Sequence, residues 1–122
     1  MITGRITVNL EPLLDDVFVK NKKGALLPVQ IILDTGFNGA IFLPKNVLKQ
    51  MEVTPIAKEV FELADGSRVE EQTYLGEIII ANEIQTVLLS GMESKVALLG
   101  MRMLLEKAAV FDLKNMTIRV IE

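Results

Sequence analysis

Residues 29–36, VQIILDTG, form the stretch that decides the fold: an apolar run ends in Asp34, and Thr35 and Gly36 follow it directly. The density of isoleucine, valine and leucine predicts a buried strand. Thr-Gly after it predicts a tight turn, because glycine permits positive φ and close backbone approach. A carboxylate at the end of such a strand lies at the floor of a cleft, where it can activate water. The triplet occurs once. A mechanism that uses two such carboxylates must therefore obtain the second one from elsewhere.

The Asp34 turn also has a plain structural interpretation. Aspartate, threonine and glycine are all common in turns, and at average residue usage a given tripeptide arises by chance in roughly a few per cent of chains this long. Under either interpretation Thr35 and Gly36 shape the turn. The surrounding sequence therefore has to decide between catalysis and an ordinary turn.

Length and composition restrict the function classes. At 122 residues the chain is expected to form a single domain, residues 1–122. A net charge of −3 argues against nucleic-acid binding. The absence of Cys and His excludes thiolate chemistry, serine-histidine triads and Cys- or His-ligated metals, and we expect neither metal nor cofactor. No secretory signal and no run of membrane-spanning length is visible, so we expect a cytoplasmic protein without membrane contact.

The remaining pattern is mostly β. The Asp65-Gly66 pair between alternating runs is a strong hairpin signal. A helix is expected at 44–51, where Pro44 suits the first turn, and another at 101–107; residues 90–95 read as a polar loop. Short strands with closely spaced turn signals predict a compact, largely antiparallel barrel or sandwich. The expected strands cover residues 5–10, 17–19, 29–33, 40–43, 60–63, 68–74, 76–81, 85–89, 96–100, 109–111 and 116–121. Residues 17–19 and 29–33 flank a polar, glycine-containing connection at 21–24, which suits a hairpin.

Three elements in this order resemble the retropepsin-like aspartic proteases (the retroviral type of clan AA), in the form of a single-domain cellular member. They are ILDTGFNGA at 32–40, Ala64-Asp65-Gly66, and Leu98-Leu99-Gly100. In that family an apolar pair precedes Asp-Thr/Ser-Gly, a later hairpin forms a flap, and an apolar-apolar-Gly element passes beneath the catalytic loop. The resemblance covers about residues 17–121. It implies a mainly β fold: a closed barrel of short antiparallel strands with a flap hairpin and one or two short helices.

The resemblance also implies an activity and an assembly. Retropepsins are homodimers in which each subunit contributes one aspartate, so this chain would be an aspartic endopeptidase whose two Asp34 carboxylates activate water against a peptide or protein substrate. The family's pattern carries over residue by residue as follows: catalytic Asp34; active-site loop Thr35 and Gly36; substrate-binding Phe37, Asn38, Ala64, Asp65 and Gly66; and supporting loop Leu98, Leu99 and Gly100.

Several positions depart from the retroviral pattern. Asn38 stands where the family often has an acid, Met101 follows Gly100 where many members have arginine, and Arg102 comes one position later. The proposed flap tip also lacks the multi-glycine sequence of retroviral flaps. Phe37 fits a substrate pocket and ordinary packing equally well. These departures keep an alternative open, a catalytically weak or silent retropepsin-fold module that binds peptides or dimerises.

Overall fold

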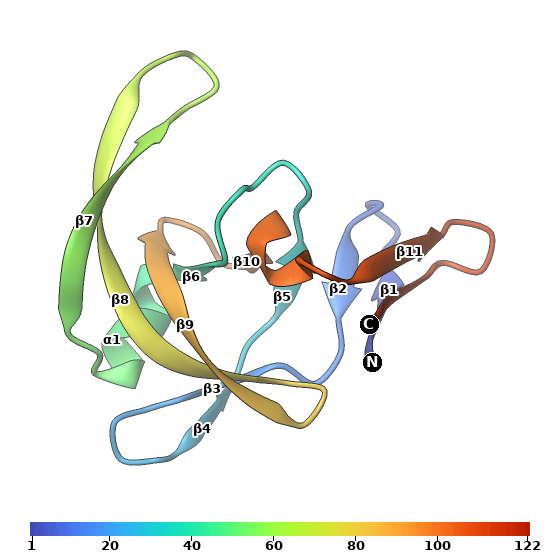
Figure 1. Cartoon of the computed structure of the whole chain (residues 1–122), viewed down its shortest axis with the longest axis horizontal. Coiled ribbons are helices and arrows are strands. Elements are labelled where there is room, and N and C mark those ends of the chain that lie inside the picture. Colours follow the sequence, from blue (N-terminus) through green and yellow to red (C-terminus); the bar gives the residue numbers. More distant parts are fainter.

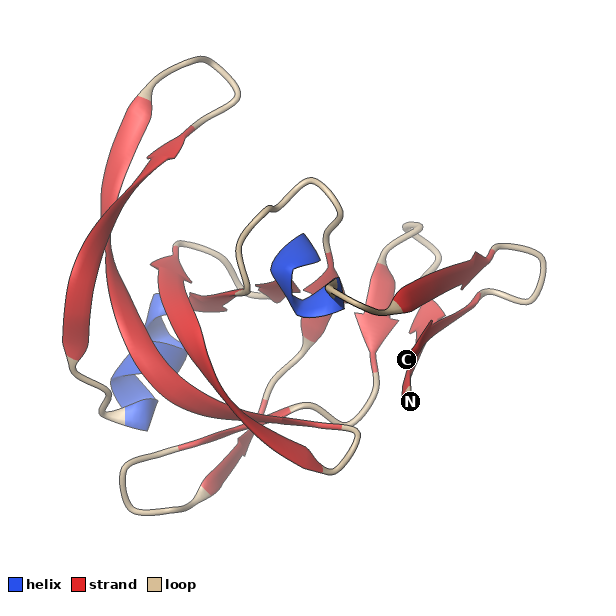
Figure 2. Cartoon of the chain, viewed as in Figure 1, coloured by secondary structure: helices blue, strands red, loops and turns tan.

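The structure is a computed structural model that describes residues 1–122, and most of them lie in twelve strands of one sheet system (Figures 1 and 2). The helices are α1 (Lys45–Met51) and a short 3-10 helix, η1 (Met101–Leu104). No helix is long and apolar enough to cross a membrane. The strands are β1 (Ile2–Ile6), β2 (Pro12–Leu14), β3 (Phe18–Lys20), β4 (Leu26–Pro28), β5 (Ile31–Leu33), β6 (Ile41–Pro44), β7 (Pro55–Glu62), β8 (Arg68–Ile80), β9 (Glu83–Met92), β10 (Ala97–Leu99), β11 (Ala108–Asp112) and β12 (Thr117–Ile121).

The sheet is open rather than the closed barrel expected from the sequence. Its strand order is β11-β12-β1-β2-β5-β10-β6-β9-β8-β3-β4, and β7 pairs with β8 off this path. Closure would need β11 and β4 to pair, and the two lie at separate ends of the molecule (Figure 1). The mainly β architecture with a long hairpin and short helices is otherwise as expected.

The core lies against the central strands, where every second residue points inward. Ile31 and Leu33 on β5, Ile41 and Leu43 on β6, and Leu99 on β10 are all buried members of one cluster of 16 residues. In β5 and β10, which pair in parallel, Leu33 lies opposite Leu99. The strand that leads to Asp34 is therefore fixed by the hydrophobic core.

The expected hairpin around Asp65-Gly66 is present and longer than the sequence indicated. Strands β7 and β8 pair from Glu62 opposite Arg68 to Pro55 opposite Tyr74. They project beyond the rest of the molecule (Figure 1), and nearly all of β7 is exposed. We call this hairpin, residues 55–74, the flap. Strand β8 continues without a break beyond the flap to Ile80, where two strands were expected.

Four other expectations were wrong in their bounds. The first strand covers 2–6 instead of 5–10, because residues 7–10 form a turn closed by the Leu10 N–H donating to the Thr7 carbonyl at 2.8 Å. The hairpin partner of β3 is β4 rather than residues 29–33. The expected loop at 90–95 is strand up to Met92, since β9 pairs in parallel with β6. The expected helix at 101–107 is only the single turn η1.

Candidate active site

Asp34 lies at the point where the buried strand β5 gives way to a turn. Its N–H donates to the Leu99 carbonyl on β10 at 2.9 Å, and its own carbonyl accepts from the Phe37 N–H at 3.2 Å. The Oδ1 atom of Asp34 accepts from the Gly36 N–H at 2.9 Å. The side chain is half-buried, whereas Thr35 and Gly36 are exposed. The carboxylate is therefore oriented by the main chain and remains accessible.

The segment that begins at Gly100 holds this turn from beneath. The N–H groups of Gly100, Met101 and Arg102 donate to the carbonyls of Ala40 (2.8 Å), Phe37 (2.8 Å) and Gly39 (3.2 Å), in that order. These bonds use N–H groups that the first turn of a helix leaves free, so they anchor η1 beneath the Asp34 turn. The expected helix is a single turn because Leu105 leaves the helical conformation, with a ψ of 133°, and Glu106 has a φ of 63°.

Gly100 is the position where this contact is tightest. A Cβ atom there would overlap the Gly39 carbonyl oxygen and would lie 2.6 Å from Phe37 Cδ2 and 2.8 Å from the Phe37 carbonyl oxygen. Two of these three neighbours are backbone atoms, which cannot rotate away. Only glycine therefore allows the two loops to approach this closely.

Three phenylalanines connect the Asp34 loop to the flap. The ring of Phe37 stacks on Phe42 of β6, with centroids 4.2 Å apart and planes at 14°. Phe42 in turn meets Phe61 of β7 edge to face, with centroids 5.2 Å apart and planes at 61°. Such pairs contribute about 0.5–1.5 kcal/mol each beyond their buried area. The flap is thus packed, through a residue close to its tip, on the loop that carries the aspartate.

A cavity of about 480 Å³ opens between the Asp34 loop and the flap. Its walls are largely apolar, and two charged groups face it from opposite sides, Glu59 on the flap and Arg102 on η1. Ten residues line it: Phe37, Asn38, Gly39, Ala40, Ile41, Glu59, Phe61, Leu88, Ser90 and Arg102. Its size and mixed lining suit an apolar side chain of a bound peptide.

Two buried hydroxyl residues lie side by side under the flap. Thr73 on β8 pairs directly with Ser90 on β9, and both are buried. The Thr73 hydroxyl is fully buried and has no hydrogen-bond partner, which costs stability.

The flap tip is a hydrogen-bonded turn that stands clear of the Asp34 loop (Figure 1). The Asp65 carboxylate accepts from the Ser67 hydroxyl at 2.6 Å and from the Ser67 N–H at 2.9 Å. These bonds, the hydroxyl first, lower the pKa of Asp65 below its usual value of 3.8. Gly66 has a φ of +87°, which this turn requires.

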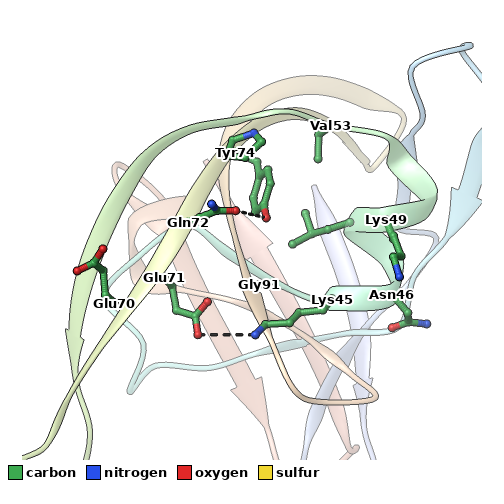
Figure 3. Close-up of a pocket in the computed structure, with 11 residues that line it drawn as sticks. Lys45, Asn46, Lys49, Val53, Glu70, Glu71, Gln72, Tyr74 and Gly91 are labelled. Carbon is green, nitrogen blue, oxygen red and sulfur yellow. Dashed lines mark hydrogen bonds and ion pairs between the residues drawn. The ribbon is translucent and has the colours of Figure 1, made fainter.

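A further cavity, of about 670 Å³, lies at the base of the flap beside α1 (Figure 3). Lys45 of α1 reaches across it to Glu71 of β8 at 3.9 Å, and also meets Glu93 at 3.6 Å. The Tyr74 hydroxyl donates to Gln72 at 3.1 Å. No residue of the Asp34 loop lines this cavity. Its ion pairs are exposed and contribute little stability, but they tie the flap base to the helix.

The sequence-predicted residues fall into four groups. Asp34, Thr35 and Leu98 line one cavity; Phe37 and Asn38 line the cavity beneath the flap. Leu99 and Gly100 support the turn through main-chain bonds and close contact. The tip residues Ala64, Asp65 and Gly66 line neither cavity and lie apart from the rest.

Sequence reasoning missed the residues of the flap that face the cavity. Glu59 and Phe61 alternate along β7 and point to the same side. Residues 55–62 show no alternation of polar and apolar residues, so no sequence signal identified this face; the pairing with β8 defines it. Phe42 and Ser90 lie opposite each other on β6 and β9, and no local signal marks a parallel pairing.

Comparison with known proteins gives a structural likeness only. No protein-family model matches the sequence, and no curated protein matches it. The fold matches the crystal structure of a retropepsin-like aspartic protease from Rickettsia conorii with a TM-score of 0.65 and 13% identity, over 98% of this chain and 91% of that one. The chain therefore has the mainly β fold of a retropepsin-like aspartic protease.

Proposed function

We propose that the chain is an aspartic endopeptidase that acts as a homodimer, with Asp34 of each subunit forming one catalytic pair. The observation that carries this proposal is the Asp34 turn: an accessible carboxylate at the end of a buried strand, oriented by main-chain bonds to Leu99 and Gly36. The chain has one such motif, so two-fold symmetry supplies the second carboxylate.

The chemistry of the pair follows from its electrostatics. Two carboxylates a few ångströms apart cannot easily both ionise, so they share one proton and titrate as a pair. The ionised member takes a proton from water as the water oxygen attacks the peptide carbonyl carbon, and the protonated member donates to the carbonyl oxygen. The tetrahedral intermediate then breaks its C–N bond as the leaving nitrogen gains a proton from the pair. This sequence uses no metal, cofactor or covalent enzyme intermediate.

The substrate would lie as an extended strand between the Asp34 loop and the flap. Phe37, Phe61 and Leu88 give the cavity beneath the flap an apolar wall, which favours an apolar substrate side chain. The Asn38 amide would bond the substrate main chain. The tip residues 64–66 would close over the substrate, a movement of the turn that extends beyond the Phe42–Phe61 contact.

A second candidate function is peptide binding without efficient cleavage. The observation that favours it is the flap tip, where Asp65 and Ser67 make a tight turn that stands clear of the Asp34 loop. A module of this kind would hold a peptide in the same cleft but leave its bonds intact.

Cleavage of a peptide library from about pH 4 to 7 tests the proposal, with Asp34→Asn compared against Asp16→Asn. The amide introduced by Asp34→Asn keeps an oxygen that accepts from Gly36 but cannot act as a base. Asp16 is exposed with a φ of 51°, a conformation that asparagine tolerates, so it is a matched carboxylate-to-amide control. We expect the Asp34 variant to lose at least about 100-fold in rate and the Asp16 variant to match the wild type. Equal cleavage by both variants, or none by a confirmed wild-type dimer, contradicts the endopeptidase proposal.

A further inference from the structure

Next to Asp34 the single chain leaves an apolar surface uncovered, and this surface shares no lining residue with the cavity beneath the flap. It forms a cavity of about 550 Å³ in which Asp34 itself is a lining residue. Glu11 and Thr35 are its other polar members. We call its apolar wall and the aspartate the Asp34 cup: Leu10, Pro12, Ile32, Asp34, Leu98 and Phe111.

Phe111 shows that the packing of the sheet is incomplete at this place. It pairs with Ile118 across β11 and β12, and residues directly opposite each other share a face. Ile118 is 1% exposed, yet Phe111 on the same face is 39% exposed. The difference arises because β11 is the outermost strand, so nothing covers the core-facing side of its phenylalanine.

Leu10 is a second residue that the monomer does not explain. Its φ is 63°, a left-handed conformation that costs a leucine roughly 1–2 kcal/mol. Its side chain is also 67% exposed, so packing within the monomer offsets little of this cost. Asparagine would suit the backbone better, and a polar side chain would suit the exposure. A surface outside the monomer that covers the Leu10 side chain would explain why leucine occupies this position.

The chain termini cannot provide the contact between two copies by strand pairing. Strand β1 is already paired on both edges, with β12 and β2, and β12 is paired with β1 and β11. The free edge on this side of the sheet belongs to β11, which borders the cup (Figure 1).

We propose that a second copy of this chain docks on the Asp34 cup, so that Leu10 and Phe111 of each subunit are buried at the two-fold axis. The inference rests on the proposed function, because a catalytic pair needs the two Asp34 carboxylates to meet. Docking on the cup brings them together, since Asp34 is part of its lining. The interface is formed by the turn at 7–10 and the β11–β12 hairpin, and the terminal strands lie behind it.

Leu10→Asn and Phe111→Asn test this interface, with Leu26→Asn as the control. Leu26 is 53% exposed on β4, the strand at the other end of the sheet. Each substitution removes an apolar contact without adding charge near Asp34. The self-association of each folded variant is measured by sedimentation from about 1 to 200 µM, and its folding by circular dichroism.

We expect a dimeric wild type and control, and a dissociation constant raised on the order of 1,000-fold in the two cup variants. The effect is large because each substitution occurs twice in a symmetric dimer. Leu10→Asn should be at least as stable as the wild-type monomer, which separates lost association from lost folding.

The outcomes distinguish this inference from the proposed function. Cup variants that dimerise and cleave like the wild type overturn the interface and leave the protease standing. Cup variants that become monomers support the interface, and if the wild-type dimer cleaves no peptide, the protease proposal alone fails. A wild type that stays monomeric up to about 200 µM overturns both the interface and the homodimeric protease.

Discussion

Replacing Gly100 with alanine should displace the Asp34 turn although the new methyl group lies outside the active site. The added Cβ would overlap the Gly39 carbonyl oxygen and approach the Phe37 carbonyl oxygen to 2.8 Å. The loop at 37–40 must then move away from Gly100. That movement lengthens the bonds from Gly100 to Ala40 and from Met101 to Phe37, both 2.8 Å long.

The magnitude follows from overpacking against backbone. Inserting a methyl group into a filled site typically costs 1–3 kcal/mol, and we expect about 3 kcal/mol because two of the three contacts of the Gly100 Cβ are main-chain oxygens. For a chain of this size that corresponds to a fall in Tm of about 10 °C. The cleavage rate should fall by more than the loss of folded protein explains. A shift of about 1 Å in a catalytic group can lower the rate about 100-fold even in a folded enzyme.

Thermal unfolding and peptide cleavage at 25 °C, where Gly100→Ala is still folded, measure the two effects. Gly66→Ala is the matched control, because its methyl meets nothing within 4 Å and only its φ of +87° is unfavourable. It should lose about 1 kcal/mol. A Gly100→Ala variant with wild-type Tm and wild-type cleavage would refute the idea that this contact fixes the Asp34 turn.

Three further predictions concern the flap. Phe61→Ala removes the edge-to-face contact with Phe42 and should lower the free energy of unfolding by about 2 kcal/mol. Hydrogen exchange in residues 55–74 should accelerate. Unchanged exchange would contradict the idea that this contact holds the flap on the Asp34 loop. Thr73→Val replaces a buried hydroxyl that has no hydrogen-bond partner and should stabilise the protein by about 1 kcal/mol. A Tm below that of the wild type would show that the hydroxyl does not destabilise the fold. Because the pKa of Asp65 is lowered by Ser67, the turn is complete above the unfolded value of 3.8 and loosens as pH falls through the lower folded value. The amide shift of Ser67 in an NMR titration should have its midpoint below 3.8, and a midpoint at or above it contradicts the bond.

Features that depend on local chemistry were predictable from the sequence. The Asp65-Gly66 turn closes the flap because only a few residue types accept its backbone angles. Pro44 precedes α1 as expected, since its fixed φ suits a helix start. The apolar runs at 29–33 and 40–43 identified β5 and β6. The retropepsin-like fold that the motif order implied agrees with the structural likeness.

Features that depend on contacts between distant segments were not predictable. Residues 90–92 look like a polar loop, but β6 supplies a parallel partner for them. Residues 101–107 contain good helix formers, yet only one turn forms: its start is anchored to the carbonyls of Phe37 and Gly39, and the chain leaves the helical conformation at Leu105. Nothing in the local sequence marks Phe42 and Phe61 as neighbours. In each case the partner lies far away along the chain, beyond the reach of pattern reasoning.

The hydrogen bonds that hold the Asp34 turn also determine when, during synthesis and folding, this turn can form. The turn receives its support from Leu99, Gly100 and Met101, close to the C-terminal end. During synthesis the aspartate leaves the ribosome long before these residues do, and long-range contacts of this kind form late in folding. A nascent chain, or one cut before residue 97, therefore carries the Asp34 triplet without the support that orients it. The Asp34 loop therefore reaches its oriented conformation only after residues 97–101 have been synthesised and have folded against it.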